Sequence, residues 1–275
     1  MGSIRQSLGI VAVLGMAMAS SALAQDDARS KLLIPEGGGL GTEVGHFPRG
    51  APGTSTGSPI AYGANWGDIY AGVGYQTPIR YSNDSDGSVT LGMGFLNSSD
   101  FVGLDVAVTS LSTIRSGFGD RMGLSAKVHR LLGDNWGIAA GVTNIYLSKQ
   151  PADSKTSYYG VVSKVFDLTD TPFKALTLSV GAGNEDFRME KDIRNNNETI
   201  GVFGSAALRI WDQLALIVDW PGQDLNIGLS IVPIKDFPIV ITPAVVDITG
   251  QAGTFGTTKT ARPRFSLGAG MAIRF

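Results

Sequence analysis

The chain has 275 residues and a formal net charge of −2, and only 17% of its residues are charged, whereas a soluble domain usually carries about 25%. The small net charge gives no electrostatic support for a nucleic-acid partner. Because the chain has no cysteine, disulfides, thiolate metal sites and a lipid-acceptor cysteine are excluded.

The first 24 residues have the pattern of a secretory signal peptide. Arg5 supplies a short positive region, residues 8–19 form an apolar run too short to span a membrane, and Ala22-Leu23-Ala24 fits the small-residue cleavage rule. We therefore expect export, with cleavage near Ala24. No later run reaches about eighteen apolar residues, so no transmembrane helix is expected.

Residues 25–65 form a separate segment without hydrophobic periodicity. Glycine, proline, serine and threonine are frequent in it, as in Gly37-Gly38-Gly39 and the run 53–58. This composition is typical of a flexible linker, so one interpretation is a periplasmic tail. The other interpretation is that part of the segment folds into the lumen of the following domain as a plug.

From Trp66 to Phe275, segments of roughly ten residues with apolar side chains at alternate positions are separated by turn signals. This pattern predicts an all-β fold, a transmembrane antiparallel up-and-down β-barrel of about twelve strands, with ten to fourteen possible. The expected strands are 66–76, 88–96, 101–112, 121–132, 135–147, 156–167, 173–184, 198–211, 213–220, 224–233, 237–248 and 263–275. Pro243 lies within one of them and predicts a bulge or kink, because proline cannot donate to a β-ladder.

The connections between these segments alternate in length. Short turns such as Gly133-Asp134 alternate with longer polar connections such as 77–87 and 185–197, and the link at 221–223 is a short exception. Short periplasmic turns and long outer loops are the arrangement of outer-membrane barrels. An even strand count then places the end of the last strand on the periplasmic side.

The last eleven residues carry the clearest single pattern. Apolar side chains occupy every second position from Phe265 to Phe275. A terminal strand that ends in phenylalanine resembles the C-terminal signal by which bacterial outer-membrane β-barrels are recognised for insertion; Gly270 and Ile273 fit that signal and Gly268 departs from it. This architectural resemblance spans roughly residues 66–275. It implies a porin-like, Gram-negative outer-membrane protein whose partners are lipid, lipopolysaccharide and the barrel-assembly machinery.

Alternate positions assign two faces to the expected barrel. The row from Trp136 to Tyr146 and the row from Phe265 to Phe275 are apolar with an aromatic residue at each end, so Trp136, Tyr146, Phe265 and Phe275 are expected in membrane-belt positions. A soluble barrel would place these rows inside instead. The signal peptide, the terminal phenylalanine and the aromatic ends favour the membrane form.

Polar residues within the strands are expected on the opposite, lumen face, since a charge in the middle of the lipid face costs roughly 2–4 kcal/mol. If the hairpin at 113–120 is symmetric about Ser116, Asp105 lies opposite Lys127. Asp68 and Arg274 are both expected near the periplasmic rim, where the first and last strands close the barrel. Paired charges of this kind are ordinarily structural. The pore-lining candidates are Asp68, Asp105, Lys127, His129, Lys164, Arg209, Asp219 and Arg274.

No motif indicates catalysis or cofactor binding. Ser125 shares the face of His129 but lies roughly 13 Å away along the strand, beyond the reach of a nucleophile–base pair. The run 83–87 lacks the distal glutamate of a calcium loop, so we expect a solvated turn. The sequence predicts no catalytic residue, no metal and no cofactor.

Three functions remain for such a barrel, because architecture does not fix function. The leading hypothesis is a narrow porin-like channel for small solutes, possible also as a homo-oligomer. The second is a non-conducting structural or assembly barrel that supports envelope or exopolysaccharide export. The third, ranked lowest, is an outer-membrane hydrolase that uses His129.

Overall fold

The computed structural model describes residues 51–80, 82–148, 155–168, 170–235, 237–250, 254–255, 258–259 and 263–274. The expected signal peptide, residues 25–50 and Phe275 lie outside these ranges. No helix in this part of the chain has the length and apolar character needed to cross a membrane.

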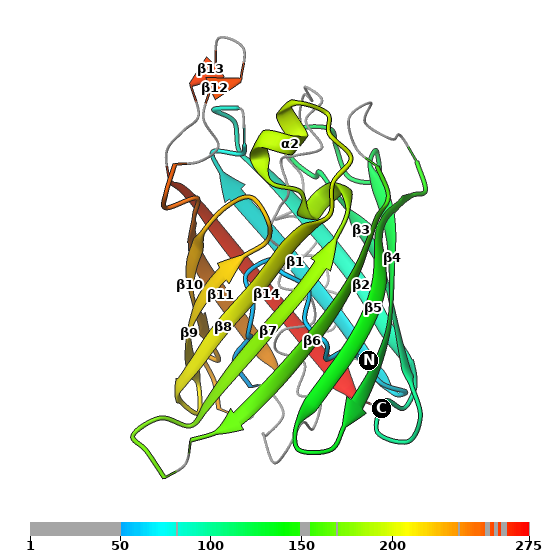
Figure 1. The fold of residues 1–275 in the computed structure, drawn as a ribbon, viewed down its shortest axis with the longest axis vertical. Helices are drawn as coiled ribbons and strands as arrows, with labels where there is room; N and C mark the ends of the chain where they lie inside the picture. The colour runs from blue at the N-terminus through cyan, green and yellow to red at the C-terminus, as the bar shows by residue number, and fades with distance from the viewer. Residues whose placement is uncertain are drawn as a thin grey trace, which may run out of the picture.

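Twelve antiparallel strands of the described residues form a closed barrel, in which neighbours in the chain are neighbours in the sheet and β14 pairs with β1 to close the ring (Figure 1). The strands are β1 (Asp68–Thr77), β2 (Asp86–Leu96), β3 (Gly103–Ser110), β4 (Met122–Leu132), β5 (Trp136–Tyr146), β6 (Ser157–Asp167), β7 (Ala175–Gly183), β8 (Gly201–Trp211), β9 (Leu214–Trp220), β10 (Asn226–Ile231), β11 (Ile239–Val246) and β14 (Arg264–Arg274). The predicted all-β barrel of twelve strands is confirmed. Insertion into a membrane stays a prediction.

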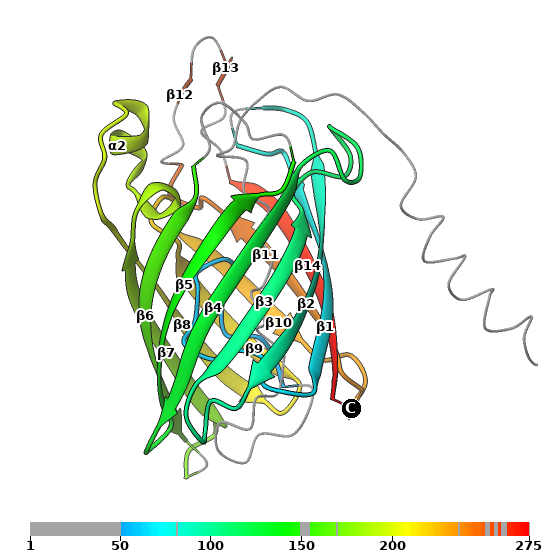
Figure 2. The same ribbon diagram turned by 90° about the vertical axis from the view of Figure 1, so that its right-hand side faces the viewer.

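The longer connections lie at one end of the barrel. They carry a 3₁₀ turn, η1 (Glu185–Phe187), the short helix α2 (Glu190–Arg194) and a two-stranded hairpin of β12 (Thr254–Phe255) and β13 (Thr258–Lys259). Figure 1 and Figure 2 both show α2 and this hairpin at the top, opposite the short turns. We call this end the mouth and the opposite end the lower rim.

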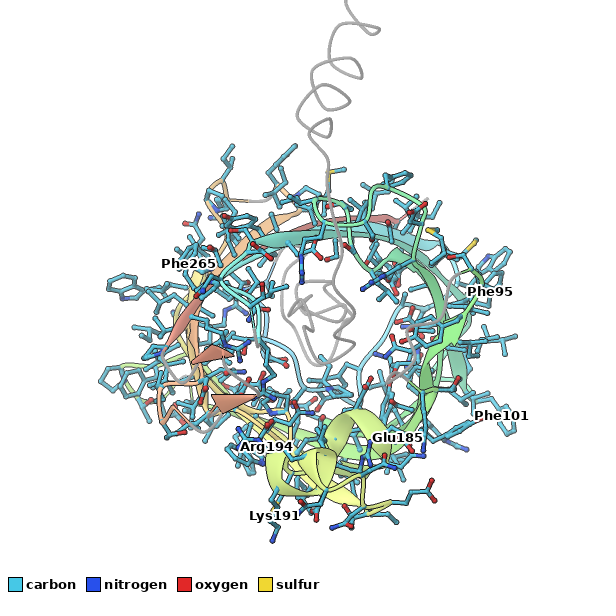
Figure 3. All side chains as sticks on the ribbon, turned by 90° about the horizontal axis from the view of Figure 1, so that it is seen from above. Phe95, Phe101, Glu185, Lys191, Arg194 and Phe265 are labelled. Atoms are coloured by element: carbon cyan, nitrogen blue, oxygen red, sulfur yellow. The ribbon has the colours of Figure 1, made fainter. Side chains whose placement is uncertain are left out.

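The outer face of the barrel is apolar at alternate positions. In β14, Phe265, Leu267, Met271 and Ile273 are exposed to between 37% and 54%, and Trp136 in β5 is exposed to 42%. Figure 3, a view from the mouth, shows Phe95 and Phe101 pointing away from the ring. Trp136 and Phe265 therefore lie on the outer face, as expected for belt residues.

The expected irregularity at Pro243 is not a bulge. Pro243 pairs with Leu267 in a continuous β11–β14 register. On the β10 side of β11 the register is the same on both sides of Pro243. In that ladder Ile227, Gly228 and Ile231 of β10 are paired with β11, and the two residues between Gly228 and Ile231 are not. The missing N–H of proline therefore interrupts the β10–β11 ladder locally without shifting the strand.

A bulge lies instead between β4 and β5. The register shifts by one residue after Ala126 pairs with Val142, so that Tyr146 pairs with Gly123. Gly123 is buried and belongs to the inner row of β4. The belt position predicted for Tyr146 is therefore wrong, because the extra residue reverses the phase of the strand at that point.

Candidate functional site in the barrel lumen

Residues 51–65, the inner segment, lie inside the barrel, where they are visible as the blue trace in Figure 2. Most of these residues are buried, and Ala61 and Ala64 are completely inaccessible. Of the two interpretations that the sequence left open, the described part of the segment thus occupies the position of a plug, fixed by hydrogen bonds along its length.

The first attachment is to Asp219 of β9, whose side chain is fully buried. Its Oδ2 atom accepts hydrogen bonds from Thr56 N at 3.1 Å, Thr56 Oγ1 at 2.8 Å and Ser58 N at 3.1 Å. Nearby, Gly53 N donates to Ser230 Oγ at 2.7 Å. Hydrogen bonds to an ionised acceptor are stronger than neutral ones, so Asp219 is the principal anchor of this part.

The second attachment crosses to the opposite side of the barrel. Ala61 N donates to Ser163 Oγ of β6 at 2.9 Å, and the Tyr62 hydroxyl donates to the Asn135 carbonyl oxygen at 2.8 Å. Lys127 Nζ of β4 donates to the Tyr62 carbonyl oxygen at 2.9 Å. The segment thus spans the lumen from β9 and β10 to β4 and β6.

The third attachment is at the lower rim. Ala64 N donates to Asp105 Oδ2 at 3.2 Å, and His129 Nε2 is 3.0 Å from the Ala64 carbonyl oxygen. Asn65 N donates to Asp68 Oδ2 at 2.8 Å, just before β1 begins. Together with Asp219 and Lys127, five of the predicted pore-lining residues therefore hold the inner segment.

Glycines on the inner face provide the space for this segment. A Cβ atom at Gly94 would lie 2.2 Å from the Asn65 carbonyl oxygen, and one at Gly137 would lie 2.7 Å from the Tyr62 ring. A side chain at either position would collide with the segment, so the backbone can approach the strands only where glycine stands. The ring of Tyr62 fills the space that the missing side chain of Gly137 leaves.

An apolar cluster fills the side of the lumen near β5 to β8. Tyr159, Phe187 and Phe203 have ring centroids 4.6 to 6.1 Å apart. Ala61 of the inner segment belongs to the same cluster. The segment is therefore held by packing as well as by hydrogen bonds.

The two predicted charge pairs are present. Asp105 lies opposite Lys127 in the β3–β4 register, with Nζ and Oδ2 3.7 Å apart. Arg274 donates to both carboxylate oxygens of Asp68, at 2.7 and 2.9 Å, across the junction of β1 and β14. Each pair faces the lumen and is hydrogen-bonded to the inner segment, the Asp105–Lys127 pair to residues 62 and 64 and the Asp68–Arg274 pair to residue 65.

Lys164 does not face the lumen, contrary to the prediction. It pairs with Trp136 and Leu178, which are exposed on the outer face. Its Nζ atom lies 5.2 Å from the Trp136 ring centroid and 5.6 Å from that of Phe166, and it hydrogen-bonds to Asp134 in the lower turn. Two aromatic rings and a carboxylate thus accommodate this cation outside the barrel.

The remaining lumen candidates have local structural partners. Arg209 lies on the inner face at the lower rim, where NH2 donates to the Asp212 carbonyl oxygen at 2.6 Å. His129 is 1% exposed, and in the described residues its ring has a hydrogen bond only to Ala64. Ser125 is four positions away in the same strand. This arrangement does not bring a nucleophile to the imidazole.

The mouth is crossed by a network of charged side chains that the sequence did not predict. Arg80, from the β1–β2 connection, is 1% exposed and pairs with Glu190 of α2 at 3.1 Å and with Asp224. Arg264 also pairs with Asp224, and Arg194 pairs with Glu190 at 2.7 Å. We call these five residues the mouth network. Burial raises the pKa of Asp224, and Arg80 and Arg264 act in the opposite direction.

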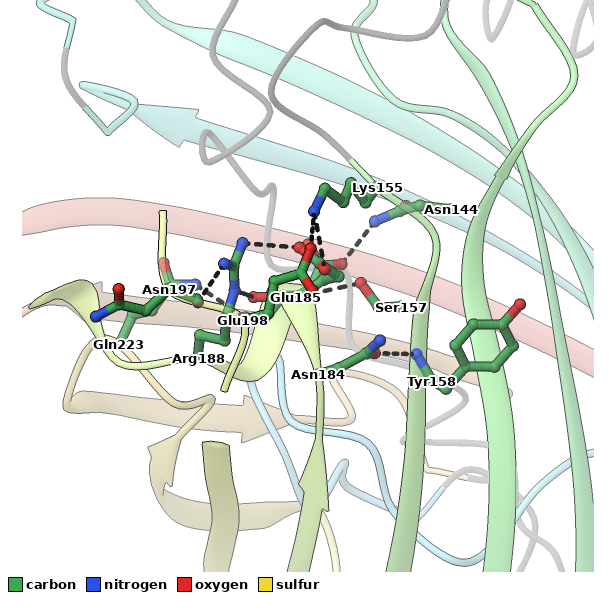
Figure 4. Close-up of polar contacts among 11 residues, drawn as sticks. Asn144, Lys155, Ser157, Tyr158, Asn184, Glu185, Arg188, Asn197, Glu198 and Gln223 are labelled. Carbon is green, nitrogen blue, oxygen red and sulfur yellow. Dashed lines mark hydrogen bonds and ion pairs between the residues drawn. The ribbon is translucent and has the colours of Figure 1, made fainter. Parts of the chain in front are cut away.

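A second polar group ties the connection between β7 and β8 to its neighbours (Figure 4). Lys155 Nζ lies 3.0 Å from Glu198 Oε1 and 3.5 Å from Glu185 Oε1. Arg188 pairs with Glu185 at 2.7 Å. The hydrogen bond from Lys155 lowers the pKa of Glu198 and raises that of Lys155.

Comparison of the sequence with protein-family models and with curated proteins finds no match. The barrel geometry and the contacts of the lumen are therefore the basis for a functional conclusion.

Proposed function

We propose that this protein is an outer-membrane channel for small solutes whose lumen is closed by its own inner segment. A closed barrel of twelve antiparallel strands is compatible with an outer-membrane channel. The observation that carries the proposal is the position of residues 51–65, buried in the lumen and bonded to both sides of it.

The chemistry of the inner face supports a channel more than a solid barrel. Where the segment lies, the strands present groups that water can solvate, such as Asp105, Ser163, Asp219 and Ser230. Each of these groups accepts a hydrogen bond from a main-chain N–H or a hydroxyl of the segment. If the segment left, the same groups would line an aqueous path of polar character.

The second candidate is a non-conducting structural or assembly barrel in the envelope. Two observations favour it: the apolar cluster of Tyr159, Phe187 and Phe203 beside the segment, and the buried mouth network at the other end. Obstruction at two levels fits a barrel that stays sealed. The two candidates differ in whether the segment leaves the lumen.

A disulfide that fixes the segment separates these candidates. A Cβ at Gly228 would lie 2.6 Å from Thr56 Cγ2, which is one bond from Thr56 Cβ, so the Cβ atoms of cysteines at 56 and 228 would lie no more than about 4.1 Å apart, near the ~3.8 Å typical of a disulfide. The natural chain has no cysteine, so the pair forms without competitors. The T56C/G228C protein is measured in planar lipid bilayers before and after reduction, beside the natural chain.

We expect conductance steps from the reduced protein and from the natural chain, and none from the oxidised protein. Equal conductance in both redox states would mean that solutes pass without movement of the segment. Silence of all three proteins, with circular dichroism that shows folded barrels, would favour the sealed barrel. Single T56C and G228C proteins control for the substitutions themselves.

The location is part of the same proposal. The apolar outer face at β14 and the aromatic residues Trp136 and Phe265 suit a bilayer, so lipid, lipopolysaccharide and the barrel-assembly machinery are the proposed partners. Density fractionation of cell envelopes, followed by detection of the protein, tests this location. Recovery with the inner membrane or the soluble periplasm would contradict it.

A further inference from the structure

The inner face around Asp219 contains polar atoms that the inner segment does not use. Asp219 Oδ1, Ser205 Oγ and Asn226 Nδ2 are buried and have no hydrogen-bond partner among the described residues. Asp219 pairs with Ser205 across β8–β9 and with Asn226 across β9–β10, so the three side chains lie side by side on the same face. We call these three residues the Asp219 patch.

Buried polar atoms are nearly always satisfied in native proteins. Asp219 and Asn226 are 0% exposed and Ser205 is 7% exposed, so bulk solvent does not serve them. One carboxylate oxygen, one hydroxyl and one amide N–H therefore converge with unused hydrogen-bonding capacity. Such a set suits a ligand that both donates and accepts.

Beside the patch, the side chain of Thr56 of the inner segment takes a place that a strand side chain would otherwise occupy. The inner row of β10 is Asn226, Gly228 and Ser230, so the middle position has no side chain. Thr56 Cγ2 lies 2.6 Å from the place that a Gly228 Cβ would take, and Ala244 Cβ is 3.2 Å from that place. Thr56 Oγ1 donates to Asp219 at 2.8 Å.

The chemistry of this occupant indicates the class of ligand. The side chain of Thr56 is a secondary alcohol, and the CH(OH) group is the unit that a polyol repeats. The anchoring donors to Asp219 are a hydroxyl and main-chain N–H groups, and residues 51–65 contain no charged side chain. Within the described residues no ion pair includes Asp219. Neutral donors, not cations, complement this carboxylate.

From these contacts we propose that the Asp219 patch is a binding subsite for a neutral polyhydroxylated solute, and that Thr56 occupies it as a resident mimic. This inference rests on the proposed function, because the solute gains access when the inner segment leaves. In this subsite the Asp219 carboxylate accepts hydrogen bonds from two hydroxyls of the solute, and the Asn226 amide donates to a third solute oxygen. The Ser205 hydroxyl can donate to the solute or accept from it. Ile217 and Ala207, both buried on the same face, supply an apolar floor for the carbon skeleton.

The test measures sorbitol binding by saturation-transfer NMR on the full chain folded in detergent. A ligand that competes with the segment binds more tightly when the segment is destabilised, in proportion to the fraction released. Gly94→Ala does this from the far side of the lumen, since its Cβ would lie 2.2 Å from the Asn65 carbonyl oxygen. Ser163→Ala, which removes the hydroxyl that binds Ala61 N, is the second releasing variant if Gly94→Ala does not fold.

We expect either releasing variant to bind sorbitol at least about ten-fold more tightly than the natural chain, and Asp219→Asn or Ser205→Ala in the same background to remove the gain. Thr109→Val is the matched control, because this buried hydroxyl on β3 bonds to Thr90 away from the patch. Binding that Asp219→Asn leaves unchanged, or no binding by a folded releasing variant, would overturn the subsite. Tetramethylammonium bound in place of sorbitol with the same dependence on Asp219 would overturn its ligand class.

The same proteins separate this inference from the channel proposal. If a releasing variant conducts in a bilayer but binds no sorbitol, the channel proposal stands and the subsite proposal is refuted. A releasing variant that binds sorbitol through Asp219 but never conducts keeps the subsite and removes the channel.

Discussion

The inner segment and the mouth network are held by different kinds of contact. The inner segment carries no charged side chain and is held by many separate hydrogen bonds to the strands. The charged partners in these bonds, such as Asp219 and Lys127, belong to the strands. At the mouth, connections far apart in the sequence are joined by buried ion pairs centred on Arg80. Hydrogen bonds of a neutral segment exchange readily for water, whereas separated buried charges are costly. This difference is why the proposed function assigns movement to the segment rather than to the mouth network.

The largest effect is expected at the mouth. Arg80→Ala leaves the buried carboxylates of Glu190 and Asp224 without one of their cations, so we expect a loss of about 3–5 kcal/mol in the free energy of unfolding. Urea unfolding in detergent, followed by circular dichroism, measures it. Lys191→Ala, an exposed cation on the same helix, serves as the control. A loss below that of the control would mean that the mouth network contributes little.

A smaller loss is expected where the inner segment passes a glycine. Gly94→Ala forces a methyl group against the backbone of residues 64–65, an overpacking that costs about 1–3 kcal/mol if the segment stays. If the segment leaves instead, open-state conductance rises while the barrel itself stays stable. Gly160→Ala is the comparison, because a Cβ there has only one neighbour, at 4.0 Å. Equal behaviour of the two variants would contradict the packing of the segment.

The anchor at Asp219 is expected to have a still smaller effect. Asp219→Asn keeps an acceptor for Thr56 and Ser58 but removes the charge, so charge-assisted bonds become neutral ones at a cost of about 1 kcal/mol. The expected readout is more frequent channel opening with little change in the urea midpoint. Unchanged opening would show that this carboxylate does not retain the segment.

The smallest effect concerns the exposed pair of Lys155 and Glu198. The pKa of Glu198 is lowered in the folded chain, so the contribution of the pair is present above the ordinary glutamate pKa and is lost as the pH falls through the lowered value. Because both groups are exposed, Glu198→Gln is expected to leave thermal stability unchanged at neutral pH. A clear loss at pH 7 would refute this reading.

The strands were predictable because their signal is local. Alternation and turn residues recur along each strand, and the symmetry of one hairpin was enough to place Asp105 opposite Lys127. The position of Lys164 was predicted wrongly because two signals conflict. Its charge favours the lumen, whereas it has the same phase in the strand as Val162 and Phe166, which face outward. Tyr146 was misplaced because nothing in the sequence marks the extra residue of the bulge.

The contacts of the lumen were beyond prediction for a different reason. They join residues such as Thr56 and Asp219 that are far apart in the chain, and neither residue carries a motif. Two signals were available: an inward carboxylate, Asp219, without a cation directly opposite it on either neighbouring strand, and an uncharged segment rich in serine and threonine just before the first strand. The mouth network had no such signal, because its residues lie in connections, in the short helix α2 and at the first residue of β14, where alternation gives no information.

The inner segment continues directly into β1, the strand that meets β14 where Asp68 and Arg274 join. The ring therefore cannot close until the last strand has been made, and by then the segment must already contact β4, β6, β9 and β10 or be threaded through a finished ring. Enclosure during assembly is the simpler route. The junction between the first and last strands is therefore the point at which we expect the barrel to be sealed around the segment.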